Sequence, residues 1–162
     1  MGKKLFTKIE DKNILFEQYK IFVESADTIS KRRDTANQFY LALNTAILSI
    51  VGYLNIFQQP SIITIGIPIF GILVNFYWRE IIISFKSMNA CKFDVIHEFE
   101  KKLPARPYAC EWDIAKEGKT NKYKPTTTIE AKIPLIFIAF YTITLFFAVY
   151  LVAVPLIFRK LF

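Results

Sequence analysis

Two long segments of the chain carry no charged side chain, and amphipathic segments lie between and before them. The uncharged segments run from Thr35 to Trp78 and from Ile133 to Phe158. A helix needs about 20 apolar residues to cross the hydrocarbon core, so the first segment is long enough for two crossings and the second for one. A soluble domain of this size could not bury three such helices. The pattern therefore predicts an all-α membrane protein with three transmembrane helices.

The first uncharged segment must be divided, and its only polar cluster is residues 58–61, which include Pro60. This predicts spans near residues 39–57 and 62–78, joined by a tight turn at the lipid surface, where the backbone freed by the proline can meet water. The third span covers residues 133–158. Pro134 near its start predicts that the helix either begins again there or kinks.

Apolar residues also recur at helical spacing on both sides of this hairpin. They are Leu15, Tyr19, Phe22, Ala26 and Ile29 before it, and Ile82, Phe85, Phe93, Ile96 and Leu103, with Asn89 on the same stripe, after it. These stripes predict two amphipathic helices that pack together, the first continuous with span one and the second ending at Pro104. From Pro104 to Pro125, prolines and a polar turn predict a loop or short hairpin. Thr127 and Glu130 have the spacing of a capping box.

The domain organisation follows from these elements. We expect an N-terminal cytoplasmic amphipathic helix (1–36), a transmembrane hairpin (37–84), a cytoplasmic helix and Pro-rich loop (85–132), a third transmembrane helix (133–158) and a tail (159–162). Eight Lys and Arg residues precede span one and none lies in the turn, so the N-terminus and the long connection are expected in the cytoplasm. Arg159 and Lys160 in the tail oppose this orientation mildly, which leaves a re-entrant third segment as an alternative.

The net charge of +7 is spread over the cytoplasmic segments and the tail and is interleaved with fourteen acidic residues. This distribution favours attraction to membrane lipids, anionic ones included, over binding to nucleic acid. No cleaved signal peptide is expected, because charges interrupt residues 1–16 throughout.

Polar amides are the informative residues within the spans. Asn37, Asn44, Asn55 and Asn75 are candidates to face a neighbouring subunit or a pore, and packing within one chain is the third alternative. Charges at the membrane edge, Arg32, Arg33 and Arg79, are expected to pair or to reach lipid headgroups. No charge lies deep in a span, which argues against a proton-coupled transporter.

Candidate catalytic and metal-binding residues are few. Cys91, Cys110 and His97 lack the spacing of a four-ligand metal site, and cytoplasmic thiols stay reduced. Asp94 and Glu98 beside His97 are typical of a solvated helix face. An enzyme acting on lipids would need an interfacial acid or base, for which only Glu80 or Glu130 is available. We therefore expect no enzyme activity, cofactor or metal.

Short motifs are spread along most of the chain: Tyr19-Lys20, Val23-Glu24, Ala26-Asp27, Arg32-Arg33, Ala36-Asn37, Leu43-Asn44-Thr45, Trp78-Arg79, Lys92-Phe93, Leu103-Pro104, Glu111-Trp112 and Ile129-Glu130. Together they resemble the RipA family of small bacterial inner-membrane proteins. The resemblance implies a multi-pass protein of the bacterial cytoplasmic membrane that assembles as a homo-octamer, in a family linked to growth inside host cells. It implies a structural, scaffold or channel-like role, and it brings no catalytic or binding residue.

A second hypothesis comes from a looser similarity to the small pore-forming effectors of bacterial defence systems. These effectors share a helix with basic residues just before a transmembrane hairpin. A toxic pore predicts that overexpression depolarises cells, whereas a scaffold predicts viable cells.

Overall fold

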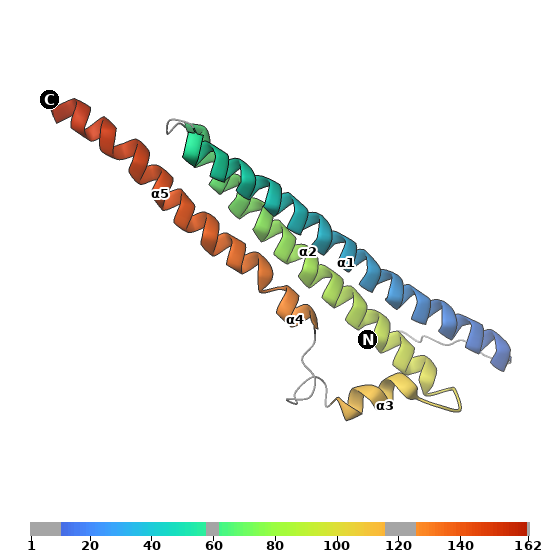
Figure 1. The fold of residues 1–162 in the computed structure, drawn as a ribbon. Helices are drawn as coiled ribbons and strands as arrows, with labels where there is room; N and C mark the ends of the chain where they lie inside the picture. Colours follow the sequence, from blue (N-terminus) through green and yellow to red (C-terminus); the bar gives the residue numbers. More distant parts are fainter. Residues whose placement is uncertain (1–10, 58–61, 116–125, 162) are drawn as a thin grey trace. The chain divides into compact units, whose positions relative to one another are not determined.

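The computed structural model describes residues 11–57, 62–115 and 126–161, with the side chains of residues 55–57 and 153–161 excepted. Every regular element in these ranges is a helix (Figure 1), so the prediction of an all-α chain is confirmed. The helices are α1 (Lys12–Phe57), α2 (Ile62–Glu100), α3 (Pro107–Ile114), α4 (Thr126–Glu130) and α5 (Ile133–Leu161). The chain divides into an amphipathic unit, Met1–Arg32 with Phe85–Pro125, and an apolar unit, Arg33–Ser84 with Thr126–Phe162.

Two helices flank the polar cluster of the first uncharged segment. Helix α1 ends at Phe57 and α2 begins at Ile62, and residues 58–61 between them lie outside the described residues. Helix α1 is one continuous helix of 46 residues, and α2 continues for 39 residues through Pro68. The amphipathic segments and the adjoining apolar segments are therefore joined without a break in the helices.

Two helical segments in the described part of the chain are long and apolar enough to cross a membrane. They are Ile62–Glu100 and Thr126–Val152. The apolar half of α1 is not among them, and it carries Asn37, Gln38 and Asn44, whose amides lower its hydropathy.

The core of the amphipathic unit lies between α1 and α2. Leu15, Ala26 and Ile29 of α1 are buried, as are Ile96 and Phe99 of α2. The rings of Phe22 and Phe99 lie 5.5 Å apart between centroids. The two predicted stripes are thus each other's partners, which confirms the sequence expectation.

Aromatic rings build the core of the apolar unit. Tyr40 of α1 stacks on Trp78 of α2 at 5.6 Å and an interplanar angle of 10°. Phe137 of α5 packs against Trp78, and Tyr141, one turn further along α5, is fully buried. All three long helices therefore contribute to one core within this unit.

Gly71 of α2 lies close against the ring of Tyr141 of α5. A Cβ atom built on Gly71 would lie 2.8 Å from three carbons of the Tyr141 ring, while one built on Gly66 would meet nothing within 4 Å. Small residues such as these two glycines allow close helix packing within a membrane. The structure assigns that role to Gly71 and leaves Gly66 exposed.

Substitution of Gly71 by alanine is expected to destabilise the apolar unit by about 1–3 kcal/mol, because the buried Tyr141 ring cannot move away from the new methyl group. Gly66→Ala is the matched control on the same helix and should be neutral or stabilising by up to about 1 kcal/mol through helix propensity. Thermal unfolding in detergent measures both. Equal melting temperatures for the two variants would contradict the packing described here.

The segment after Pro104 differs from its prediction. We expected a loop or short hairpin, but α3 forms there, with Pro107 in its first turn. Glu130 also departs from the predicted capping box. Its Oε2 contacts the side chains of Arg33 and Asn37. Pro134 lies in the first turn of α5, so the helix begins again there, and a kink inside one helix is not needed.

Candidate functional site

A relay of four polar side chains joins three segments of the apolar unit. The indole Nε1 of Trp78 donates to Oδ1 of Asn37 at 3.0 Å. The amide of Asn37 donates in turn to Oε2 of Glu130 at 3.1 Å. The guanidinium Nε of Arg33 lies 3.0 Å from the same Oε2, without the alignment of a hydrogen bond, so this contact is an ion pair. The relay links α1 and α2 to the short helix that precedes α5.

Burial determines how much this relay contributes to the stability of the apolar unit. The side chains of Arg33 and Glu130 are each 14% exposed, and Trp78 is fully buried. Water screens such a pair weakly, and removal of one partner leaves the other charge largely desolvated. The relay therefore fixes the start of α5 against α1 and α2, and these four side chains are called the clamp below.

A second polar site lies deeper in the same unit, where Asn44 faces Asn75. Each amide donates to the carbonyl of the other, at 3.2 Å and 2.7 Å. Each also donates to the backbone carbonyl four residues earlier, Tyr40 for Asn44 and Gly71 for Asn75. Both side chains are fully buried within one chain. Of the alternatives left open by the sequence, this geometry supports intramolecular packing for the two residues.

The reciprocal pair predicts strong energetic coupling. Asn44→Leu or Asn75→Leu alone should destabilise the protein by about 1–2 kcal/mol, because the remaining amide loses its partner in an apolar surrounding. The double variant should be less destabilised than the sum of the two, since leucine has a shape similar to that of asparagine and leaves no polar group unpaired. A double-mutant cycle of thermal stability measures the coupling, and strictly additive effects would contradict it.

The remaining residues singled out from the sequence lie at the surface or outside the described side chains. Arg32 is exposed, and the partly exposed Arg79 pairs with its exposed neighbour Glu80 at 3.1 Å. Asn55 lies in α1, but its side chain is outside the described ones. Their expected roles stay predictions.

Glu100 forms a polar centre in the amphipathic unit that sequence reasoning missed. Its carboxylate is fully buried and accepts the backbone N–H groups of Tyr108 and Ala109, each at 2.9 Å, and the hydroxyl of Tyr19 at 3.3 Å. A carboxylate is favourable at the N-terminus of a helix, so Glu100 caps α3 from the end of α2. Pro107 at the start of a helix was the available signal, because proline is favoured there.

The same buried environment shifts the pKa of the Tyr19 hydroxyl. Burial, followed by the charge and hydrogen bond of Glu100, raises the pKa of Tyr19 from 10.0 to about 12. An unfolded phenol ionises at its ordinary value. The contribution of neutral Tyr19 to stability is therefore fully present below pH 10 and is lost as the pH rises towards 12.

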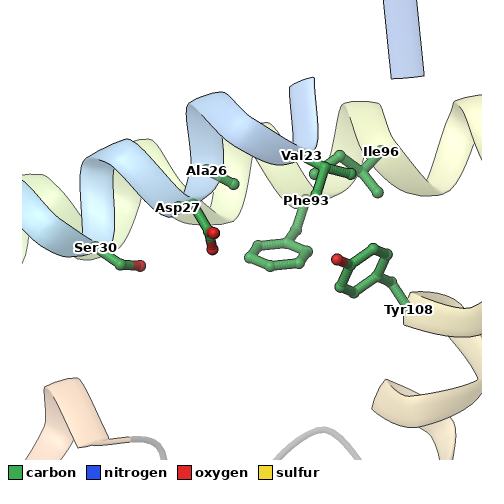
Figure 2. A pocket seen from close by; sticks show the side chains of 7 residues that line it. All are labelled: Val23, Ala26, Asp27, Ser30, Phe93, Ile96 and Tyr108. Atoms are coloured by element: carbon green, nitrogen blue, oxygen red, sulfur yellow. The ribbon is translucent and has the colours of Figure 1, made fainter. Parts of the chain in front are cut away.

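A small recess opens between α1, α2 and α3 of the amphipathic unit (Figure 2). Its volume is about 50 Å³, and it is lined by Val23, Ala26, Asp27, Ser30, Phe93, Ile96 and Tyr108. The rings of Phe93 and Tyr108 meet at 5.8 Å with an interplanar angle of 66°. The recess thus combines aromatic walls with a carboxylate and a hydroxyl.

The candidate metal and catalytic residues do not converge. Among the described residues, no group of three or more His, Cys, Asp or Glu side chains is arranged to hold a metal ion. Cys91 and Cys110 are free and exposed. Asp94, His97 and Glu98 border an open cleft of about 400 Å³ that also exposes Lys101 and Arg106. Mixed charges around an open cleft are typical of a solvated surface.

Comparison with known families decides the classification. The family model 8xMP, described as the octameric membrane protein family, matches residues 16–150. The chain belongs to the octameric membrane protein family. The match covers most of the described helices, including the clamp and the asparagine pair. No curated protein and no solved structure has significant similarity to the chain.

Membership of the octameric membrane protein family agrees with the resemblance drawn from the short motifs. It indicates a homo-oligomeric membrane protein, and the two long apolar helices agree with a membrane location. The family carries no enzymatic description. The asparagine pair and the Glu100 carboxylate are satisfied by hydrogen bonds inside one protomer, so in this member they stabilise the subunit.

Proposed function

We propose that the chain is a three-span protein of the bacterial cytoplasmic membrane that assembles as a homo-octamer and serves as a scaffold. The N-terminus and the connection between α2 and α4 face the cytoplasm, and the apolar half of α1 is the additional span. The uncharged segment from Thr35 to Trp78 supports this span, since it is long enough for two crossings. The eight basic residues that precede it support the orientation.

The asparagine pair is the observation that favours a scaffold over a channel. A water-filled pathway needs polar groups that are open to it. Asn44 and Asn75 are fully buried in the apolar unit, and the amide of each donates to the other side chain and to a backbone carbonyl. Side chains that are buried and hydrogen-bonded in this way do not line an aqueous path through the protomer.

Ion flux in liposomes tests the scaffold. The purified protein, reconstituted at several octamers per vesicle, is expected to leave a potassium gradient and a membrane-potential dye unchanged. Overexpression in bacteria should likewise leave the membrane potential intact. Depolarisation that Asn44→Leu relieves would instead support the pore-forming effector.

The native cysteines test the orientation. Cys91 and Cys110, the only cysteines of the chain, are both exposed and lie in the connection assigned to the cytoplasm. A membrane-impermeant maleimide should therefore leave the protein unlabelled in intact spheroplasts and label it in inside-out vesicles. Labelling in intact spheroplasts would reverse the orientation.

A further inference from the structure

The recess between α1, α2 and α3 is lined by hydrogen-bond acceptors and by no basic side chain. Asp27 contributes a carboxylate, Ser30 a hydroxyl, and Tyr108 a phenol (Figure 2). Asp27 is exposed, and Lys31, four residues further along α1, does not line the recess. Among the described residues, neither the Asp27 side chain nor that of Ser30 has a hydrogen-bond or ion-pair partner.

The aromatic walls define the chemistry of a ligand for the recess. The Phe93 and Tyr108 rings present π-electron density, which attracts organic cations. A volume of about 50 Å³ accommodates roughly three to five non-hydrogen atoms, at about 10–15 Å³ for each water-sized group. A group that is cationic, carries several N–H donors and has a short apolar body fits all these properties.

We propose that the recess binds a primary ammonium group carried on a short alkyl chain, with Asp27 as its counter-ion and Phe93 and Tyr108 as its aromatic walls. Ser30 lies in the same recess and offers a further acceptor. The ammonium comes either from a soluble amine or from an aminophospholipid headgroup, which share this chemistry. The proposal is independent of the scaffold role, since the site lies wholly within the amphipathic unit.

Calorimetric titration of propylammonium chloride into the full chain, held in phosphatidylglycerol nanodiscs, tests the site. Wild type is expected to give a saturable isotherm. Asp27→Asn should weaken the affinity by about tenfold or more, through loss of the charge partner. Phe93→Leu should weaken it by about threefold, through loss of the ring face. Glu24→Gln removes an exposed carboxylate one turn away on α1 that does not line the recess, and should bind as wild type does.

Nanodiscs that contain phosphatidylethanolamine distinguish the two sources. If the headgroup is the ligand, propylammonium binds more weakly to wild type in these discs, and Asp27→Asn removes the difference between the two lipids. If a soluble amine is the ligand, the isotherm is the same in both. Absence of saturable binding to wild type in phosphatidylglycerol, or equal affinity of Asp27→Asn and Glu24→Gln, would overturn the proposal.

Discussion

Replacement of Glu130 by glutamine is expected to lower the stability of the apolar unit by about 2–4 kcal/mol, because the largely buried Arg33 then keeps only a longer contact, at 3.5 Å, with the exposed carboxylate of Asp34. Glutamine keeps an oxygen that can accept from Asn37, so the loss is one of charge and not of shape. In a chain of this length the change corresponds to a fall in melting temperature of roughly 5–15 °C. Thermal unfolding in detergent, followed by the fluorescence of buried Trp78, measures it.

Two further variants separate the clamp from a general effect of charge. Glu80→Gln removes a carboxylate that is 67% exposed and pairs only with its neighbour Arg79, so it should change the stability by less than about 0.5 kcal/mol. Arg33→Met combined with Glu130→Gln should recover part of the loss, since no buried charge remains unpaired. Similar melting temperatures for Glu130→Gln and Glu80→Gln would mean that the clamp does not stabilise the unit.

Substitution of Glu100 by alanine is expected to release α3 from α1 and α2. The carboxylate accepts three hydrogen bonds in a fully buried position, and each bond to a charged acceptor contributes about 1.5–3 kcal/mol. These contributions are not additive, so we expect a total loss of about 3–5 kcal/mol for the docking of α3. Glu100→Gln should lose less, because its oxygen still accepts one of the two N–H groups.

Amide hydrogen exchange measures the loss of the hydrogen bonds to Glu100 directly at the two N–H groups that donate them. The amides of Tyr108 and Ala109 should exchange much faster in Glu100→Ala, while amides in the core of the apolar unit keep their protection. Glu98→Ala is the matched control, since Glu98 lies on the same turn of α2, is half-exposed and pairs with Lys101. Unchanged protection of Tyr108 and Ala109 in Glu100→Ala would contradict the assignment of Glu100 as the cap.

The long helices were predictable because their signals are local. The absence of charge between Thr35 and Trp78, broken only by the polar cluster around Pro60, predicted the ends of α1 and α2 at Phe57 and Ile62. The pairing of the two amphipathic stripes followed from their matching periods. These patterns depend only on neighbouring residues and on the solvent that each face meets.

The polar contacts could not be predicted, because they join residues far apart in the sequence. Asparagines in a span indicate that partners exist, but not that Asn44 meets Asn75 or that Asn37 meets Glu130, 93 residues away. Gly66 and Gly71 likewise looked equivalent until Tyr141 was placed against one of them. Helix α3 was missed because its cap comes from Glu100, a residue that belongs to another helix.

Single-particle imaging of the wild-type protein in nanodiscs tests the central claim most directly. The claim is that Asn44 and Asn75 pair with each other inside each protomer. The protomers then assemble as an octamer that encloses no aqueous path lined by these asparagines. The expected result is an eightfold particle in which Asn44 and Asn75 face each other inside every subunit. A lone protomer, or a ring whose water-filled axis is lined by Asn44, would contradict it.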